Sequence, residues 1–169
     1  MPKREGDPTW ALVITCVLSH LPLFLAFNLL RKRKLTFEMV VCGFSIFVSF
    51  MYHLCECLEA IIYLPEIKWH RLDNIGAISS TMGTFINLAC LGPETTALVE
   101  SVGFMLVLIL QEGYPWNELF TIGPIVVSGG IPFFMYLLGY RKVKQCLMLK
   151  PFFTGIVLTF VGSFFLFLD

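Results

Sequence analysis

Charged residues are scarce in this sequence, and their scarcity excludes a soluble domain. Lys, Arg, Asp and Glu make up 14% of the 169 residues, against roughly 25% in an average soluble protein. Hydrophobic residues make up 57% of the chain, which is the composition of a membrane protein. The 12 basic and 12 acidic residues cancel and lie at the ends of hydrophobic runs. Nucleic acid is therefore not an expected partner.

Cysteine pairs of the Cys-x-x-Cys type are also absent, as is any Asn-x-Ser/Thr acceptor for glycosylation. Four of the six cysteines lie in or beside hydrophobic runs, where we expect them to pack as small apolar side chains: Cys16, Cys42, Cys90 and Cys146. Cys55 and Cys57 are too close in sequence to form a disulfide with each other. The cysteines therefore indicate packing rather than reactivity.

Long hydrophobic runs account for nearly all of the chain. A helix of about 20 residues crosses the ~30 Å hydrocarbon core of a bilayer, and six runs approach that length. They predict transmembrane spans near 9–30, 37–54, 74–91, 96–110, 119–138 and 151–168. The predicted fold is an all-α, polytopic transmembrane helical bundle that forms a single domain over residues 1–169. The short connections leave no room for a separate soluble domain.

The distribution of basic residues predicts the orientation in the membrane. Eight of them follow the first and fifth spans: Arg31, Lys32, Arg33, Lys34, Arg141, Lys142, Lys144 and Lys150. The opposite side holds four: Lys3, Arg4, Lys68 and Arg71. Loops rich in Lys and Arg stay in the cytosol. We therefore expect a lumenal or extracellular N-terminus in the plasma membrane or secretory pathway, with a loop over residues 56–72 on that same side.

Polar side chains on the second and third spans mark a candidate site. Ser45, Ser49, His53 and Glu56 are four, four and three residues apart, so they share one face of a helix. Asp73 begins the third span, on the side of the membrane where the second span ends with His53. An ionisable group in hydrocarbon costs at least ~2.5 kcal/mol unless it is paired or faces a cavity. These residues are therefore functional-site candidates.

Three of these side chains suit a zinc-dependent hydrolase. A catalytic zinc takes three protein ligands and a water molecule whose pKa it lowers. His53 could be one ligand, Asp73 could take a proton from that water or orient a ligand, and Ser49 could stabilise a developing oxyanion. The alternative is a packing contact between helices without any metal. Spacing alone leaves both interpretations open.

Further polar residues follow in the third and fourth spans. Asp73, Ser80, Thr84 and Asn87 fall along one helical face, and we expect the last three to form hydrogen bonds between helices. Glu100 lies in the fourth span with no Lys or Arg four residues away on either side. Its role stays open at this stage.

The order of these motifs resembles the CREST superfamily of membrane hydrolases. Ser49-x3-His53 at the end of the second span, followed by Asp73 at the start of the third, is similar to the first two motifs of that group. Phe37-Glu38-Met39-Val40, Tyr52-His53-Leu54-Cys55 and Gly123-Pro124-Ile125 are closest to the branch that contains myomaker and the phospholipase acting after attachment of glycosylphosphatidylinositol anchors. The resemblance extends over residues 9–169. It implies a seven-span fold, zinc, and membrane lipids as partners.

The family pattern also has a third motif, His-x3-His at the start of a seventh span, and this sequence has none. His20, within the first span, and His70, expected in a loop, do not replace it. The sequence therefore looks like a seven-span protein that stops before its last span. One hypothesis is a zinc-dependent hydrolase of a lipid amide or ester. The other is a catalytically incomplete protein that acts in membrane remodelling, fusion or binding of protein partners or a second copy, with a channel ranked below both.

Overall fold

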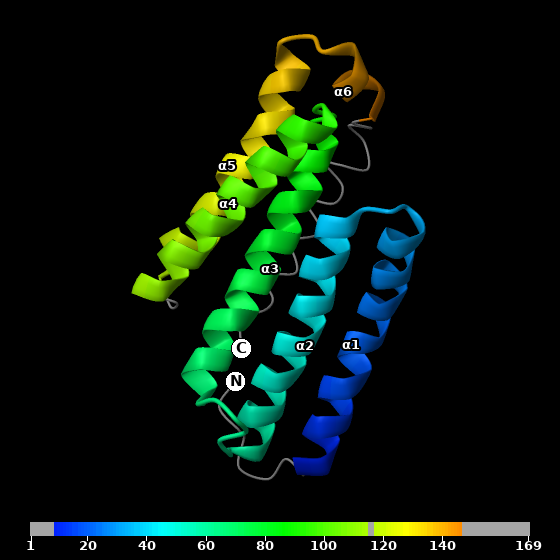
Figure 1. The fold of residues 1–169 in the computed structure, drawn as a ribbon. Coiled ribbons are helices and arrows are strands. Elements are labelled where there is room, and N and C mark those ends of the chain that lie inside the picture. The colour runs from blue at the N-terminus through cyan, green and yellow to red at the C-terminus, as the bar shows by residue number, and fades with distance from the viewer. Residues whose placement is uncertain (1–8, 115–116, 147–169) are drawn as a thin grey trace, which may run out of the picture.

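The computed structural model describes residues 9–114 and 117–146, and every regular element in this part of the chain is a helix. The elements are α1 (Thr9–Lys32), α2 (Thr36–Leu58), α3 (Glu66–Leu88), α4 (Pro93–Gly113), α5 (Glu118–Leu137) and α6 (Arg141–Cys146). The expected all-α bundle is confirmed. Figure 1 shows α1, α2 and α3 side by side, with α4 and α5 on the other side of α3.

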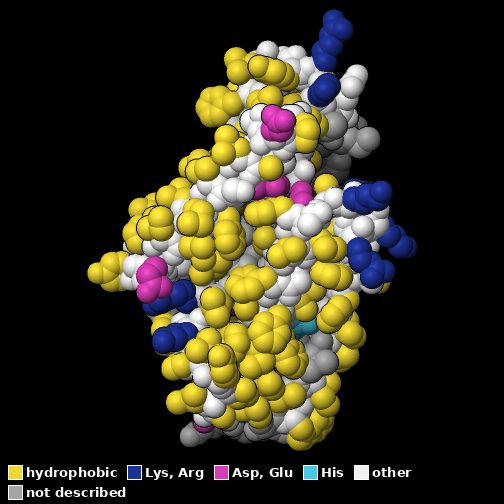
Figure 2. Space-filling model, in the orientation of Figure 1, with side chains coloured by type: hydrophobic (Ala, Val, Ile, Leu, Met, Phe, Trp, Pro, Cys, Tyr) yellow, Lys and Arg dark blue, Asp and Glu magenta, His cyan; other side chains and the backbone are white. Residues whose placement is uncertain are grey.

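Four of these helices are long and apolar enough to cross a membrane: Val13–Lys32 within α1, and the whole of α2, α4 and α5. Hydrophobic side chains cover most of the face seen in Figure 2. Side chains such as Leu25, Ile109 and Val127 are more than half exposed. Exposed apolar surface on this scale needs a hydrocarbon solvent. The chain is an integral membrane protein.

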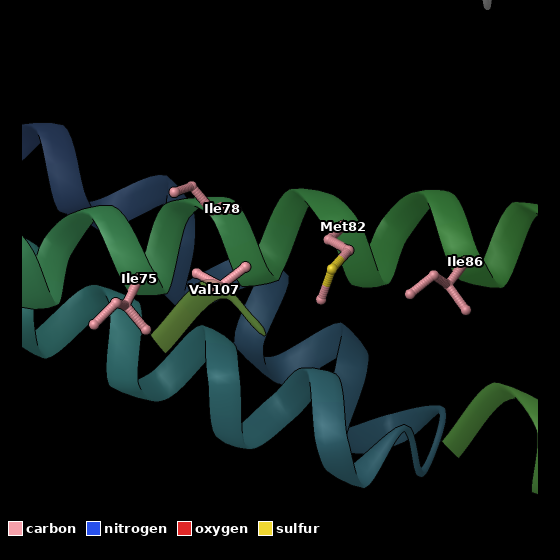
Figure 3. Packing of buried hydrophobic residues seen from close by; sticks show 5 residues of the cluster. All are labelled: Ile75, Ile78, Met82, Ile86 and Val107. Carbon is pink, nitrogen blue, oxygen red and sulfur yellow. The ribbon is translucent and has the colours of Figure 1, made fainter. Parts of the chain in front are cut away.

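The central helix of the bundle is α3, which contacts α2, α4 and α5. Its buried side chains Ile75, Ile78, Met82 and Ile86 form a cluster with Val107 of α4, and Figure 3 shows them along the helix. The helix is less hydrophobic than its neighbours and is not among the four that could cross a membrane by composition. Some of its polar side chains contact neighbouring helices, as Asn74 does with Gln111 of α4 and Asn87 with Glu38 of α2.

Short sequence signals set the helix ends. Pro93 is the first residue of α4, a position that has no hydrogen-bond partner for an N–H and so tolerates proline. The Asn117 side chain accepts a hydrogen bond from the backbone N–H of Leu119 at 2.9 Å and caps α5. The chain leaves α2 through Glu59, which adopts the left-handed conformation with φ of 51°.

The close approach of α2 and α3 depends on Gly76. A Cβ atom added there would lie 2.7 Å from the Ser45 hydroxyl oxygen and 3.0 Å from the Ser45 Cα. The missing side chain therefore lets the two backbones meet where the polar residues of α2 face α3. The hydroxyls of Ser45 and Ser80 lie 3.0 Å apart at the same level.

The structure departs from the expected boundaries mainly at α3. Residues 66–72 were expected in a loop, but α3 begins at Glu66, directly after Pro65. Asp73 therefore lies within the helix, roughly 10 Å from its first residue, and does not begin it. Hydropathy missed these first two turns because they carry charged residues. The expected span near 151–168 lies outside the described residues.

Candidate functional site

The three residues singled out by the sequence meet between α2 and α3. The Ser49 hydroxyl of α2 hydrogen-bonds the Asp73 carboxylate of α3. The His53 imidazole, one turn further along α2, is close enough to Asp73 to interact electrostatically with it. The face shared by Ser49 and His53 is thus turned toward the carboxylate, as the four-residue spacing requires.

The other two histidines also gather at this carboxylate. His20 of α1 and His70 of α3 both interact electrostatically with Asp73. The ring centroids of His20 and His53 are 6.0 Å apart, and His20 is only 5% exposed. All three histidines of the chain therefore interact electrostatically with one carboxylate. We call Ser49, Asp73 and the three histidines the Asp73 cluster.

This outcome corrects the expectations for His20 and His70. His70 is a helical residue of α3, not a loop residue, and it precedes Asp73 by three positions, so both lie on one helical face. The ring of Tyr52 connects it to α2, with centroid distances of 4.9 Å to His53 and 5.0 Å to His70. The His-x2-Asp spacing was the available signal for His70. For His20 there was none, because sequence does not give the rotation of α1.

Hydrogen bonds extend from the Asp73 cluster to α4 and α5. The Asn74 side-chain amide lies 3.3 Å from His70 Nε2 and donates to Gln111 Oε1 of α4 at 3.3 Å. Gln111 is fully buried and donates in turn to the backbone carbonyl of Phe120 at 3.3 Å. Near the C-terminal end of α2, His53 Nδ1 lies 3.3 Å from Glu56 Oε2. The cluster is therefore continuous with polar contacts across the bundle.

Zinc, which the resemblance implies, stays a prediction. No group of three or more His, Cys, Asp or Glu side chains in residues 9–114 and 117–146 is arranged to hold a metal ion. A catalytic zinc needs three protein ligands. The expected ligand, His53, is instead paired with a carboxylate of its own helix. Its Nδ1 atom lies 3.3 Å from Glu56 Oε2, three residues further along α2.

A second polar cluster lies at the opposite end of α3, and it explains Glu100. The Asn87 amide donates to Glu38 of α2, and also to Glu100 of α4 at 3.1 Å. Glu100 is 3% exposed. We call Glu38, Asn87 and Glu100 the Glu38 cluster. The expected hydrogen bonds between helices are thus present at Asn87 and Ser80, whereas the Thr84 hydroxyl donates to the Ser80 carbonyl of its own helix.

Fold and site together define an all-α integral membrane protein with polar clusters buried between its helices. The chain belongs to the family described as a protein of unknown function (DUF3522), whose model matches residues 8–169. A search of curated proteins finds no match.

Proposed function

We propose that this chain is a multi-pass membrane protein that acts in membrane remodelling, fusion or partner binding rather than as an enzyme. The resemblance to the CREST branch that contains myomaker supports this role. The bias of Lys and Arg toward two loops supports a lumenal or extracellular N-terminus, in the plasma membrane or the secretory pathway. In this proposal the Asp73 cluster connects α1, α2 and α3 and performs no chemistry.

The observation that carries the proposal is that Ser49 and His53 of the Asp73 cluster already contact neighbouring side chains. Ser49 is committed to Asp73, and His53 to Glu56 and to the edge of the His20 ring. Hydrogen bonds between membrane helices contribute about 0.6 kcal/mol each. Removing one partner leaves a polar group uncompensated in hydrocarbon, so the cluster specifies which helices meet and at which register.

Two variants test this proposal in purified protein and in cells. His53→Ala should lower the thermal stability or alter the oligomeric state, because the contacts of this imidazole with Glu56 and with the His20 ring are lost. Asp73→Asn should keep the fold, since a carboxamide oxygen still accepts the hydrogen bond from Ser49. Neither should change the cellular lipid profile, measured by mass spectrometry. Accumulation of one lipid amide or ester in both variants would overturn the proposal.

The alternative is a zinc-dependent hydrolase of a membrane lipid amide or ester, of the ceramide or glycosylphosphatidylinositol-anchor type. The observation in its favour is a carboxylate that accepts a hydrogen bond from a serine and lies within electrostatic reach of three imidazoles. Such groups can hold and move a proton next to a reacting ester or amide. In this reading Asp73 is the acid or base and Ser49 stabilises the oxyanion.

Metal stoichiometry separates the two functions. The folded, purified chain is equilibrated with equimolar zinc, and bound metal is measured by plasma mass spectrometry. One zinc per chain that is lost in His53→Ala but kept in Ser101→Ala, a substitution at an exposed serine of α4, would favour the hydrolase. No bound zinc with the fold intact would remove this alternative for the 169-residue chain.

A further inference from the structure

A cavity of about 660 Å³ lies between α1, α2 and α3, away from the Asp73 cluster. Its lining runs from Leu23 in α1 to Arg33, directly after the helix, which corresponds to roughly 15 Å. Apolar side chains such as Leu23, Ala26 and Val41 make up most of the wall. Pockets of this volume hold small-molecule ligands in other proteins. Its length and apolar lining fit a single hydrocarbon chain.

The polar part of the wall belongs to the Glu38 cluster. Glu38 and Asn87 both line the cavity, with Glu100 directly behind Asn87. Neither carboxylate forms an ion pair with a Lys or Arg among the described residues. Asn87 neutralises neither of them, because an amide carries no charge. The Glu38 carboxylate, which lines the cavity without a basic partner among the described residues, therefore favours a ligand that brings a positive charge.

A buried serine at the other end of the cavity provides an independent observation. Ser79 lines it, is fully buried, and its hydroxyl has no hydrogen-bond partner among the described residues. Buried hydroxyls without a partner are rare and costly. Ser79 and Asn87 are eight residues apart on α3, roughly 12 Å along the helix axis. A second polar group on the ligand at that distance would satisfy the hydroxyl.

We propose that this cavity binds a linear amphiphile with an ammonium group at Glu38 and a hydrogen-bonding group near Ser79. The hydrocarbon chain between them lies along Leu23, Ala26 and Val41. The exposed Arg33 lines the cavity near the turn between α1 and α2 and favours the opposite charge there. The amine is preferred because the Glu38 carboxylate is half-buried in the cavity wall, whereas the Arg33 guanidinium is exposed.

Binding of tritiated decylamine to the full chain in phosphatidylcholine nanodiscs tests the proposal, with empty nanodiscs subtracted. We expect saturable binding, and at least tenfold weaker competition by decanoic acid and by decan-1-ol than by unlabelled decylamine. Glu38→Gln should weaken binding at least tenfold. Glu94→Gln, at an exposed carboxylate in the first turn of α4, should leave it unchanged.

A second ligand tests the contact with Ser79. 10-Aminodecan-1-ol carries a hydroxyl at the far end of the same chain, so it should bind at least threefold more tightly than decylamine. Ser79→Ala should remove that gain and leave the affinity for decylamine unchanged. Equal binding of the two amines would overturn the role of Ser79.

Three outcomes would overturn the whole proposal: no saturable binding, equal competition by all three head groups, or stronger competition by decanoic acid, which would assign the cavity to anions at Arg33. If Glu38→Gln fails to fold, filling the cavity decides instead. Ala26→Phe should abolish binding, whereas Ala77→Phe, at an exposed position of α3, should not. Binding that survives Ala26→Phe in a folded protein would place the amine elsewhere.

Discussion

Replacing Gly76 by alanine tests the contact between α2 and α3 on which the Asp73 cluster depends. The new Cβ would lie 2.7 Å from the Ser45 hydroxyl oxygen, 3.0 Å from its Cα and 3.1 Å from its Cβ. Rotation of the Ser45 side chain relieves only the first of these contacts. The backbone contact remains, so the two helices have to separate.

The size of the effect follows from a comparison with Gly123. Alanine at either position gains roughly 1 kcal/mol of helix propensity, but a Cβ at Gly123 of α5 meets nothing within 4 Å. The difference between the two variants therefore isolates the clash, and an extra methyl group in a packed site costs about 1–3 kcal/mol. We expect Gly76→Ala to be less stable than Gly123→Ala by that amount.

Equilibrium unfolding in mixed detergent, followed by tryptophan fluorescence, measures this difference. Trp69 is 4% exposed and packs in the same region of α3, so it reports on that contact. Gly103→Ala provides an intermediate case, because its Cβ would meet only the flexible end of Met82 at 2.6 Å. Equal stability of the Gly76 and Gly123 variants would refute the close approach, and with it the pairing of Ser49 with Asp73.

Two further substitutions probe other contacts. Asn87→Leu removes the amide between Glu38 and Glu100 and should destabilise the protein by about 1–3 kcal/mol in the same unfolding assay. The control, Thr84→Val, changes an exposed residue bonded to its own helix and should cost less. Equal effects would mean that the amide has no special role. Asn117→Ala removes the cap of α5 and should lower the free energy of unfolding by about 1 kcal/mol. We expect faster hydrogen exchange in the first turn of α5, and unchanged exchange there would contradict the cap.

Much of the architecture could be predicted from the sequence because a membrane imposes a length on each hydrophobic run. The described helices α1, α2, α4 and α5 cover the runs near 9–30, 37–54, 96–110 and 119–138, extended by one turn or less at most ends. Hydropathy fails at α3 for a physical reason. Its first two turns carry Glu66, Lys68 and Arg71, and hydropathy reads such a charged stretch as a loop. In the bundle Arg71 forms an ion pair with Glu112 of α4, and Lys68 is exposed.

The candidate site was predictable where helical periodicity acts within one element. Four-residue spacing placed Ser49 and His53 on one face, and the ends of consecutive spans placed Asp73 opposite them. His20 could not be assigned in this way, because its contact with His53 depends on how α1 is rotated against α2. The contacts of Asn87 with Glu38 and Glu100 could not be predicted from the sequence either. Three different helices have to meet before the amide can bridge the two carboxyl groups.

The polar character of α3 has a consequence for how the protein is made. Each segment leaving the ribosome partitions into the bilayer according to its own transfer free energy, and a central Asp, Lys or Arg adds about 2.5–3.5 kcal/mol. A segment such as α3 gains little by leaving the translocon alone. Because α2 is synthesised first and its Ser45 faces α3 at Gly76, we expect α3 to enter the bilayer against α2 as a hairpin, so that insertion depends on their contact.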